Sequence, residues 1–129
     1  MFSAKQMTDK QITGNDGENL ACDFLIRKGY KIIERNYLKP WGELDIITKD
    51  RSGVLVFVEV KTMRCLPANT VLQPEDNLTD AKLKKLRRTA EMFAGKHPEL
   101  IDSDLGWRID LVAICLTSNK SKIRHYENV

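Results

Sequence analysis

The sequence predicts a mixed β-sheet with helices packed against it, in the α/β or α+β class. Two segments carry apolar residues at helical spacing, and five others are rich in β-branched residues and bounded by turn signals. The predicted order is α-β-β-β-α-β-β. A chain of 129 residues is long enough for one domain with its own core. We expect that domain over residues 14–129, after a flexible arm over residues 1–13.

The first helix is predicted from about Gly17 to Lys28. Asn15 or Asp16 can cap its N-terminus, and Gly29 is suited to end it. One apolar stripe follows the helical period: Leu20, Ala21, Phe24 and Leu25. Three strands are expected next, over Tyr30 to Tyr37, Glu43 to Thr48 and Val54 to Thr62.

The segment from Met63 to Leu78 contains two prolines and has no clear period, so we expect a long loop there. Thr79 then opens a second helix that ends near Gly95. Its apolar face consists of Leu83, Leu86, Ala90 and Phe93. A fourth strand is predicted over Trp107 to Leu116, and a fifth, at the sheet edge, over Lys122 to Glu127.

Composition excludes some classes of protein. The chain is 42% hydrophobic with a formal net charge of +3, and it has neither a bilayer-length apolar run nor a signal-like apolar segment near its start. We therefore expect a cytoplasmic protein with no membrane partner. Cys22, Cys65 and Cys115 are too widely spaced for a zinc motif or a disulfide framework, so we expect three reduced thiols.

Charged residues interrupt the second and third strands, which are otherwise built for burial. A three-residue hairpin loop ending at Gly53 would place Asp45 opposite Glu59 and Glu43 opposite Lys61. Opposed carboxylates are costly in a sheet unless a cation compensates them. Mg²⁺ prefers oxygen ligands of this kind. A plain ion pair between Glu59 and Lys61, with Asp45 exposed, is the alternative reading.

These segments resemble a known family. GENLA near the start, then GELDII, VFVEVKT, PEDNLTDAKLKKL and RIDLVAI, together resemble the YraN family of small bacterial proteins. That family is placed in the PD-(D/E)xK superfamily of restriction-endonuclease-like nucleases, close to the archaeal Holliday junction resolvases. The similarity runs from about Gly14 to Tyr126. It implies a restriction-endonuclease-like core, and the related resolvases make a homodimer a further expectation.

The resemblance also implies roles for particular residues. Asp45 and Glu59 would be metal ligands for Mg²⁺ or Mn²⁺, Lys61 the catalytic lysine, and Glu18 an additional catalytic acid. For Glu18 a simple role as a helix N-terminal acid, favoured by the helix dipole, remains open. Family members usually carry an arginine directly after the EVKT block, but here Met63 takes that position and Arg64 follows.

The second predicted helix has a strongly basic surface that indicates nucleic-acid binding. Its cations lie mostly away from the apolar stripe: Lys82, Lys84, Lys85, Arg87 and Arg88. Such a face neutralises backbone phosphates, and Arg64 could add a contact. A solvated helix face balanced by acids elsewhere is the alternative. For Asp110, in an apolar strand, we expect a packing or hydrogen-bonded role.

Two functions follow from these patterns. The first is a Mg²⁺-dependent endonuclease that hydrolyses DNA phosphodiester bonds, including structured or branched DNA. The second is a non-catalytic nucleic-acid-binding module of nuclease fold. A weaker third is an interaction domain with no role at nucleic acids.

Overall fold

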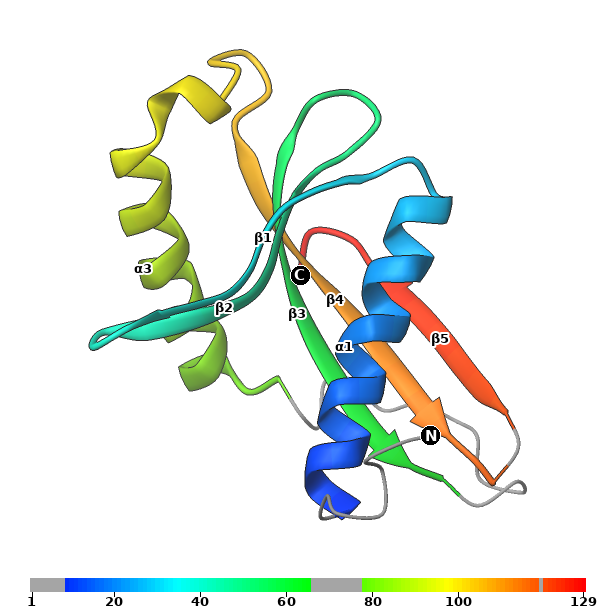
Figure 1. The fold of residues 1–129 in the computed structure, drawn as a ribbon. Coiled ribbons are helices and arrows are strands. Elements are labelled where there is room, and N and C mark those ends of the chain that lie inside the picture. Colours follow the sequence, from blue (N-terminus) through cyan, green and yellow to red (C-terminus); the bar gives the residue numbers. More distant parts are fainter. Residues whose placement is uncertain (1–8, 66–77, 119) are drawn as a thin grey trace.

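The structure of the chain is a computed structural model that describes residues 9–65, 78–118 and 120–129. Its elements in chain order are α1 (Asp9–Arg27), β1 (Lys31–Lys39), β2 (Gly42–Lys49), β3 (Leu55–Arg64), α3 (Asp80–Lys96), the short 3-10 helix η2 (Pro98–Leu100), β4 (Trp107–Leu116) and β5 (Ser121–Tyr126). The predicted class and order are confirmed: a mixed five-stranded sheet flanked by helices (Figure 1).

The strands lie in the order β1-β2-β3-β4-β5. Only the central pair, β3 and β4, is parallel, and the chain passes through α3 between them. The edges of the sheet are therefore antiparallel hairpins, whereas its centre is a crossover connection. Both faces of β3 are covered, which explains its nearly continuous apolar run.

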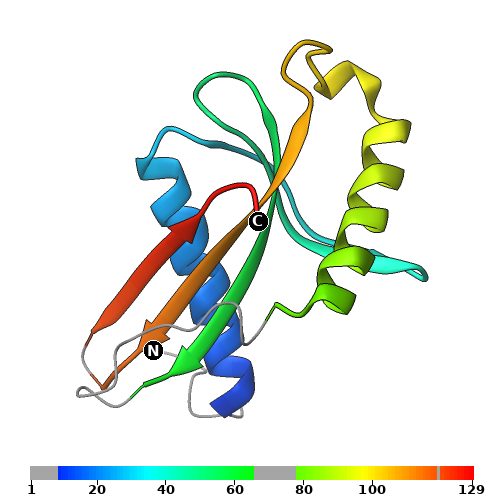
Figure 2. The same ribbon diagram turned by 180° about the vertical axis from the view of Figure 1, so that it is seen from behind.

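Each helix covers one face of the sheet, and the two views in Figures 1 and 2 show them on opposite sides. Under α3 the core contains Phe93, Leu55 and Phe57. Under α1 it contains Leu25, Val56 and Val58. Alternation along β3 thus assigns successive side chains to the two helices, as strand geometry requires.

The first helix begins earlier than predicted. It is described from Asp9 instead of Gly17, so Asn15 and Asp16 lie inside the helix and not at its N-terminus. Gly17, the predicted start of the helix, lies within it and allows a close approach to the sheet: a Cβ there would overlap the Thr62 side chain on β3. Residues 9–13 of the expected arm thus belong to the helix, and the first eight residues lie outside the described ranges.

The end of α1 is as predicted. Gly29 has a φ of +93°, and its N–H donates to the carbonyl of Ile26 (2.9 Å). The N–H of Tyr30 donates to the carbonyl of Leu25, also at 2.9 Å. This pair of bonds is a Schellman ending, which the left-handed glycine makes available.

The hairpin between β2 and β3 also matches the prediction. Gly53 has a φ of +90°, and the Asp50 carboxylate accepts the N–H groups of Ser52 and Val54. The resulting register pairs Ile47 with Phe57. Thr79 caps α3 as expected, since its hydroxyl accepts the N–H of Lys82 (3.3 Å).

Two other expectations are corrected at the end of β3. Met63 and Arg64 belong to this strand and not to a loop, and the remaining loop residues, 66–77, lie outside the described ranges. A disulfide joins Cys65 and Cys115, with Cα atoms 5.6 Å apart, whereas Cys22 is free and buried. Parallel pairing of β3 with β4 brings these distant cysteines together, which sequence spacing does not reveal.

The hairpin of β1 and β2 leaves the sheet near its middle. The paired positions of β2 and β3 end at Ile46 and Val58, although β2 continues back to Gly42. Figure 1 shows this hairpin turning away from β3 and passing beneath α3. Gly42 meets α3 so closely that a Cβ would overlap the hydroxyl of Thr89. The free part of β2, before Ile46, therefore has no backbone pairing with β3 within the described residues; it pairs with β1 and packs against α3.

Within the described residues, no helix is both long enough and apolar enough to cross a membrane.

Gly42→Ala should lower the free energy of unfolding by about 1–3 kcal/mol, the usual cost of overpacking, because the new methyl group overlaps Thr89. Chemical denaturation would measure the change. Adding Thr89→Ala should restore part of the loss. Gly95→Ala is the matched control: nothing lies within 4 Å of its added Cβ, so this helical change should be neutral or stabilise by about 0.5–1 kcal/mol. Equal losses from both glycines would contradict this account.

Candidate active site

Asp45 lies where β2 separates from β3. Its half-buried carboxylate accepts the backbone N–H of Val60 on β3 at 2.8 Å. A strand carbonyl would ordinarily take that N–H in an antiparallel ladder. Opposite Asp45 on β1, Asn36 has a φ of +53°, so both strands of the hairpin depart from regular geometry at this point. The local bend turns the Asp45 side chain toward β3.

Glu59 and Lys61 lie on the face of β3 that α3 covers, the same face as Leu55 and Phe57. Glu59 lines a cavity of about 450 Å³ beneath α3. Together with Lys61 it also lines a second, smaller cavity of about 150 Å³. Asp45 and Glu59 meet through a hydrogen bond between their carboxyl groups, although the paired positions of β2 and β3 end one step earlier than predicted, at Ile46 and Val58.

A shared proton explains how two acids can lie together here. Burial, the charge of Asp45 and the hydrogen bond to Asp45 raise the pKa of Glu59 to about 8, while Lys61 opposes the rise. Burial also raises the pKa of Asp45, although its bonds from Val60 and Glu59 act in the other direction. Near neutral pH, and without a cation, Glu59 therefore keeps its proton and Asp45 carries the charge.

Glu18 reaches the same region from α1. It is 27% exposed and lies 3.7 Å from the guanidinium of Arg35, whose backbone pairs with Ile46 beside Asp45. Burial and the negative charge of Asp45 raise the pKa of Glu18, and Arg35 lowers it. Because the charge of Asp45 acts on Glu18, Glu18 lies at the margin of the carboxylate pair, where it forms an ion pair with Arg35.

Glu43 does not face Lys61 across a ladder as expected, since β2 and β3 have separated before that position. It lines the larger cavity together with Glu59. Its charge contributes to raising the pKa of both Asp45 and Glu59. The divergence of the strands therefore adds a fourth acid to the region, after Asp45, Glu59 and Glu18.

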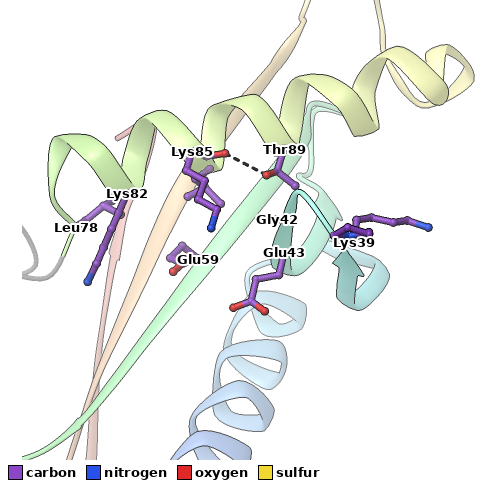
Figure 3. A pocket seen from close by; sticks show the side chains of 10 residues that line it. Lys39, Gly42, Glu43, Glu59, Leu78, Lys82, Lys85 and Thr89 are labelled. Carbon is purple, nitrogen blue, oxygen red and sulfur yellow. Dashed lines mark hydrogen bonds between the residues drawn. The ribbon is translucent and has the colours of Figure 1, made fainter.

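The five basic residues predicted to bind nucleic acid on α3 divide into two groups. Lys82 and Lys85, one turn apart, line the larger cavity with Thr89. Figure 3 shows both lysines extending from α3 on the side where Glu59 and Glu43 lie. The other three are exposed elsewhere on the helix: Lys84, Arg87 and Arg88. Arg87 turns toward the end of the chain and donates to the carbonyl of Val129 (3.1 Å).

Arg64 lies apart from this group. It is exposed at the end of β3, five residues beyond Glu59 and therefore about 16 Å along the strand. Strand alternation also puts it on the face opposite to Glu59 and Lys61. Met63, at the position where the resemblance leads one to expect an arginine, packs against Ala113 and Cys115.

The two meeting carboxylates suit a hard cation. Mg²⁺ is usually held by one or two carboxylates, with water and substrate phosphate completing its shell. Asp45 and Glu59 supply such a set, and burial together with neighbouring acids raises the pKa of both, so their charged forms are disfavoured without a cation. Across the described ranges, no three Asp, Glu, His or Cys side chains form a ready-made metal cage. A partly protein-bound, substrate-completed ion fits this donor set.

Asp110 has a structural role, as expected. It is fully buried and receives Arg108 Nε (2.9 Å) and the N–H of Asn128 (3.0 Å), while His125 Nε2 lies 2.8 Å away. Burial alone would raise the pKa of Asp110, but these hydrogen bonds outweigh it and lower the pKa. Arg108 also pairs with Asp50 in the turn before β3 (2.8 Å).

Sequence reasoning missed two contributors to the site. The backbone N–H of Val60 holds Asp45, and no side-chain pattern signals such a bond. Thr89 is the residue of α3 that contacts Gly42. In the sequence only its spacing could have indicated this role: it lies seven residues after Lys82 and four after Lys85, on the same helix face as these lysines.

Comparison with known proteins gives the family. The family model described as "Uncharacterised protein family UPF0102" matches residues 17–114. The chain belongs to the UPF0102 family. This is the YraN family that the sequence resembles. The matched span includes Glu18, Asp45, Glu59 and Lys61 as well as the basic residues of α3.

Relatives from distant bacteria match nearly the whole chain. A UPF0102 protein of Corynebacterium efficiens is 38% identical over 125 residues, covering 95% of this chain and 94% of its own length. One of Thermodesulfovibrio yellowstonii is 36% identical over 115 residues, with 89% and 92% covered. One of Syntrophomonas wolfei is 37% identical over 112 residues, with 87% and 91% covered. The UPF0102 chain is thus similar to these proteins along almost their full length.

In metal-free buffer, the free energy of unfolding should fall as the pH rises from about 4.5 to about 8. Over this window the folded protein holds a proton on Glu59 that the unfolded chain has released, so a rise in pH favours unfolding. One such proton gives a slope of at most about 1.4 kcal/mol per pH unit. Denaturant titrations at several pH values would measure it.

Glu59→Gln should flatten this dependence, since glutamine can still donate to Asp45 but does not titrate. Glu34→Gln, an exposed change on β1, should leave the slope as in the wild type. Parallel stability curves for Glu59→Gln and the wild type would show that Glu59 titrates normally.

Proposed function

We propose that this chain is a Mg²⁺- or Mn²⁺-dependent endonuclease that hydrolyses phosphodiester bonds of DNA. The observation that carries the proposal is the meeting of Asp45 and Glu59 beside Lys61, at the border of a cavity that Lys82 and Lys85 also line. Such hydrolysis needs acids that bind a cation, a lysine beside them, and further lysines that bind phosphate. The resemblance to PD-(D/E)xK nucleases supports the same roles.

Asp45 and Glu59 would hold the cation. When bound, such an ion polarises a phosphoryl oxygen and lowers the pKa of a bound water. The chain's own contribution is to fix the two ligands: the Val60 N–H orients Asp45, and the pleat of β3 orients Glu59. Glu59 must release its proton to bind a cation, so cation binding and proton release are linked.

Lys61 follows Glu59 by two residues on the same face and lines the smaller cavity with it. From there its ammonium can orient an attacking water or stabilise charge that develops on the phosphate. Glu18 and Arg35 lie at the margin, where Glu18 adds negative charge close to Asp45. Lys82 and Lys85 line the larger cavity, where they can neutralise phosphates next to the one that is cut.

The exposed basic surface of α3 favours a second candidate: a nucleic-acid-binding module that does not cut. All five of its lysines and arginines are exposed. This function predicts salt-dependent DNA binding without any need for a cation. The experiments below separate it from the nuclease.

Asp45→Asn and Lys61→Ala should each reduce cleavage of DNA in Mg²⁺ or Mn²⁺ by a factor of about 10² or more, because each removes a group that acts at the reacting phosphate. DNA affinity, measured by fluorescence anisotropy, should change little. Glu34→Gln serves as the control and should cleave like the wild type. Full cleavage by either site variant would refute this mechanism, and binding without cleavage by the wild type would favour the module.

Titration calorimetry with Mn²⁺, then Mg²⁺, should give saturable 1:1 binding that the Asp45→Asn, Glu59→Gln double variant loses. Repeating the titration near neutral pH in buffers of different ionisation enthalpy should reveal release of about one proton, the proton that Glu59 holds without a cation. Binding that is unchanged in the double variant, or that releases no proton, would place the cation elsewhere.

A further inference from the structure

The larger cavity lies between α3 and the free part of the β1–β2 hairpin. Its volume is about 450 Å³, and Glu59 lies at its border, so a group inside it would adjoin the carboxylate pair. Figure 3 shows the arrangement, with Lys82 and Lys85 on α3 and Gly42 and Glu43 on the hairpin. This volume is in the lower part of the range of about 300–1,000 Å³ typical of small-molecule sites.

The chemistry of the walls suits one nucleotide. Lys82 and Lys85 extend from α3 along the cavity, whereas Lys39 lines it with its ammonium over the Tyr37 ring. Two acids, Glu43 and Glu59, also line it, and Glu59 is hydrogen-bonded to Asp45. Apolar surface lies among them, from Pro40, Leu78 and Leu86. Cations can hold a phosphate while apolar groups pack against the flat face of a base, which is the usual combination in sites for unpaired strands.

One end of the cavity is closed. Gly42 on the hairpin and Thr89 on α3 lie so close that a side chain on the hairpin there would overlap Thr89, whose hydroxyl donates to the carbonyl of Lys85 (3.1 Å). The space that remains, about 450 Å³, suits a single nucleotide and is too small for a base pair with its two backbones. A single unpaired nucleotide needs to enter from the open side only.

We propose that this cavity holds one unpaired nucleotide next to the scissile phosphate, so that the substrates are single strands or duplexes with unpaired nucleotides at the cut. The inference rests on the proposed function for the cleavage step alone. It parallels the general solution by which enzymes that must reach an atom within a duplex act on a strand that is already unpaired or take a nucleotide out of the stack. Lys85 would hold the phosphate of that nucleotide.

Binding can be measured apart from cleavage. Fluorescence anisotropy in EDTA would compare a short labelled DNA strand, its blunt duplex, and the same duplex with a central bulge of unpaired nucleotides. The strand and the bulged duplex should bind about tenfold or more tightly than the blunt duplex, since stacking of a base adds to the phosphate contacts. Equal or tighter binding of the blunt duplex would overturn the proposal.

Lys85→Ala and Lys84→Ala are a matched pair, because the two lysines are neighbours on α3 and only Lys85 lines the cavity. Lys85→Ala should weaken binding of the strand about fivefold and reduce the slope of log affinity against log salt by about 0.7, the value for one phosphate of a single strand. Lys84→Ala should change both much less. Equal effects of the two variants would also overturn the proposal.

The outcomes separate this inference from the proposed function. Cleavage in Mg²⁺ at fully paired positions, with no preference for unpaired ones, would leave the nuclease standing and remove the unpaired-nucleotide site. If the protein prefers unpaired strands in a Lys85-dependent way but cleaves no substrate, the unpaired-nucleotide site would stand and the nuclease would be removed. Cleavage confined to the unpaired nucleotides and their immediate neighbours would support both.

Discussion

The hydrogen bond from the Val60 N–H to the Asp45 carboxylate determines how the rest of the site is arranged. In an uninterrupted ladder a backbone carbonyl of β2 would occupy that place, and the two strands would stay paired. The side chain substitutes for the backbone, so β2 is free to leave the sheet without orphaning a buried donor. The cavity under α3, the approach of Glu43 and the contact of Gly42 with Thr89 all follow from that departure.

The acids at this point are unfavourable for the folded state by themselves. Burial raises the pKa of Asp45, Glu59 and Glu18, and the charge of Asp45 raises the pKa of both Glu59 and Glu18 further. A proton on Glu59 relieves the repulsion near neutral pH, and a divalent cation would relieve it more fully. The opposite pattern appears at Asp110, where Arg108 and neighbouring donors satisfy the buried carboxylate and lower its pKa. Of the two sites, only the Asp45–Glu59 pair has raised pKa values, so only there would a bound cation relieve repulsion between carboxylates.

Much of this could be predicted from the sequence because it depends on local rules. Hydrophobic period, the Thr79 cap and the Gly29 ending gave the helices and strands to within a few residues, except at the start of α1. The three-residue loop ending at Gly53 set the register that joins Asp45 with Glu59. What escaped prediction depends on contacts between distant segments: Gly17 against Thr62, Gly42 against Thr89, and Cys65 against Cys115. No local pattern encodes these approaches.

The central parallel pair has a consequence for how the molecule folds. Strands β1, β2 and β3 follow one another through short turns, so the acids and Lys61 can be assembled from contacts close in sequence. The pairing of β3 with β4 must wait for the chain to pass through α3, and such long-range closure is slow. We therefore expect folding in two stages. The strands that carry the acids, β2 and β3, pair early, and α3 with its lysines packs over them late. A chain halted between these stages would display unsatisfied acids to the solvent and lack the cations that attract a phosphate backbone.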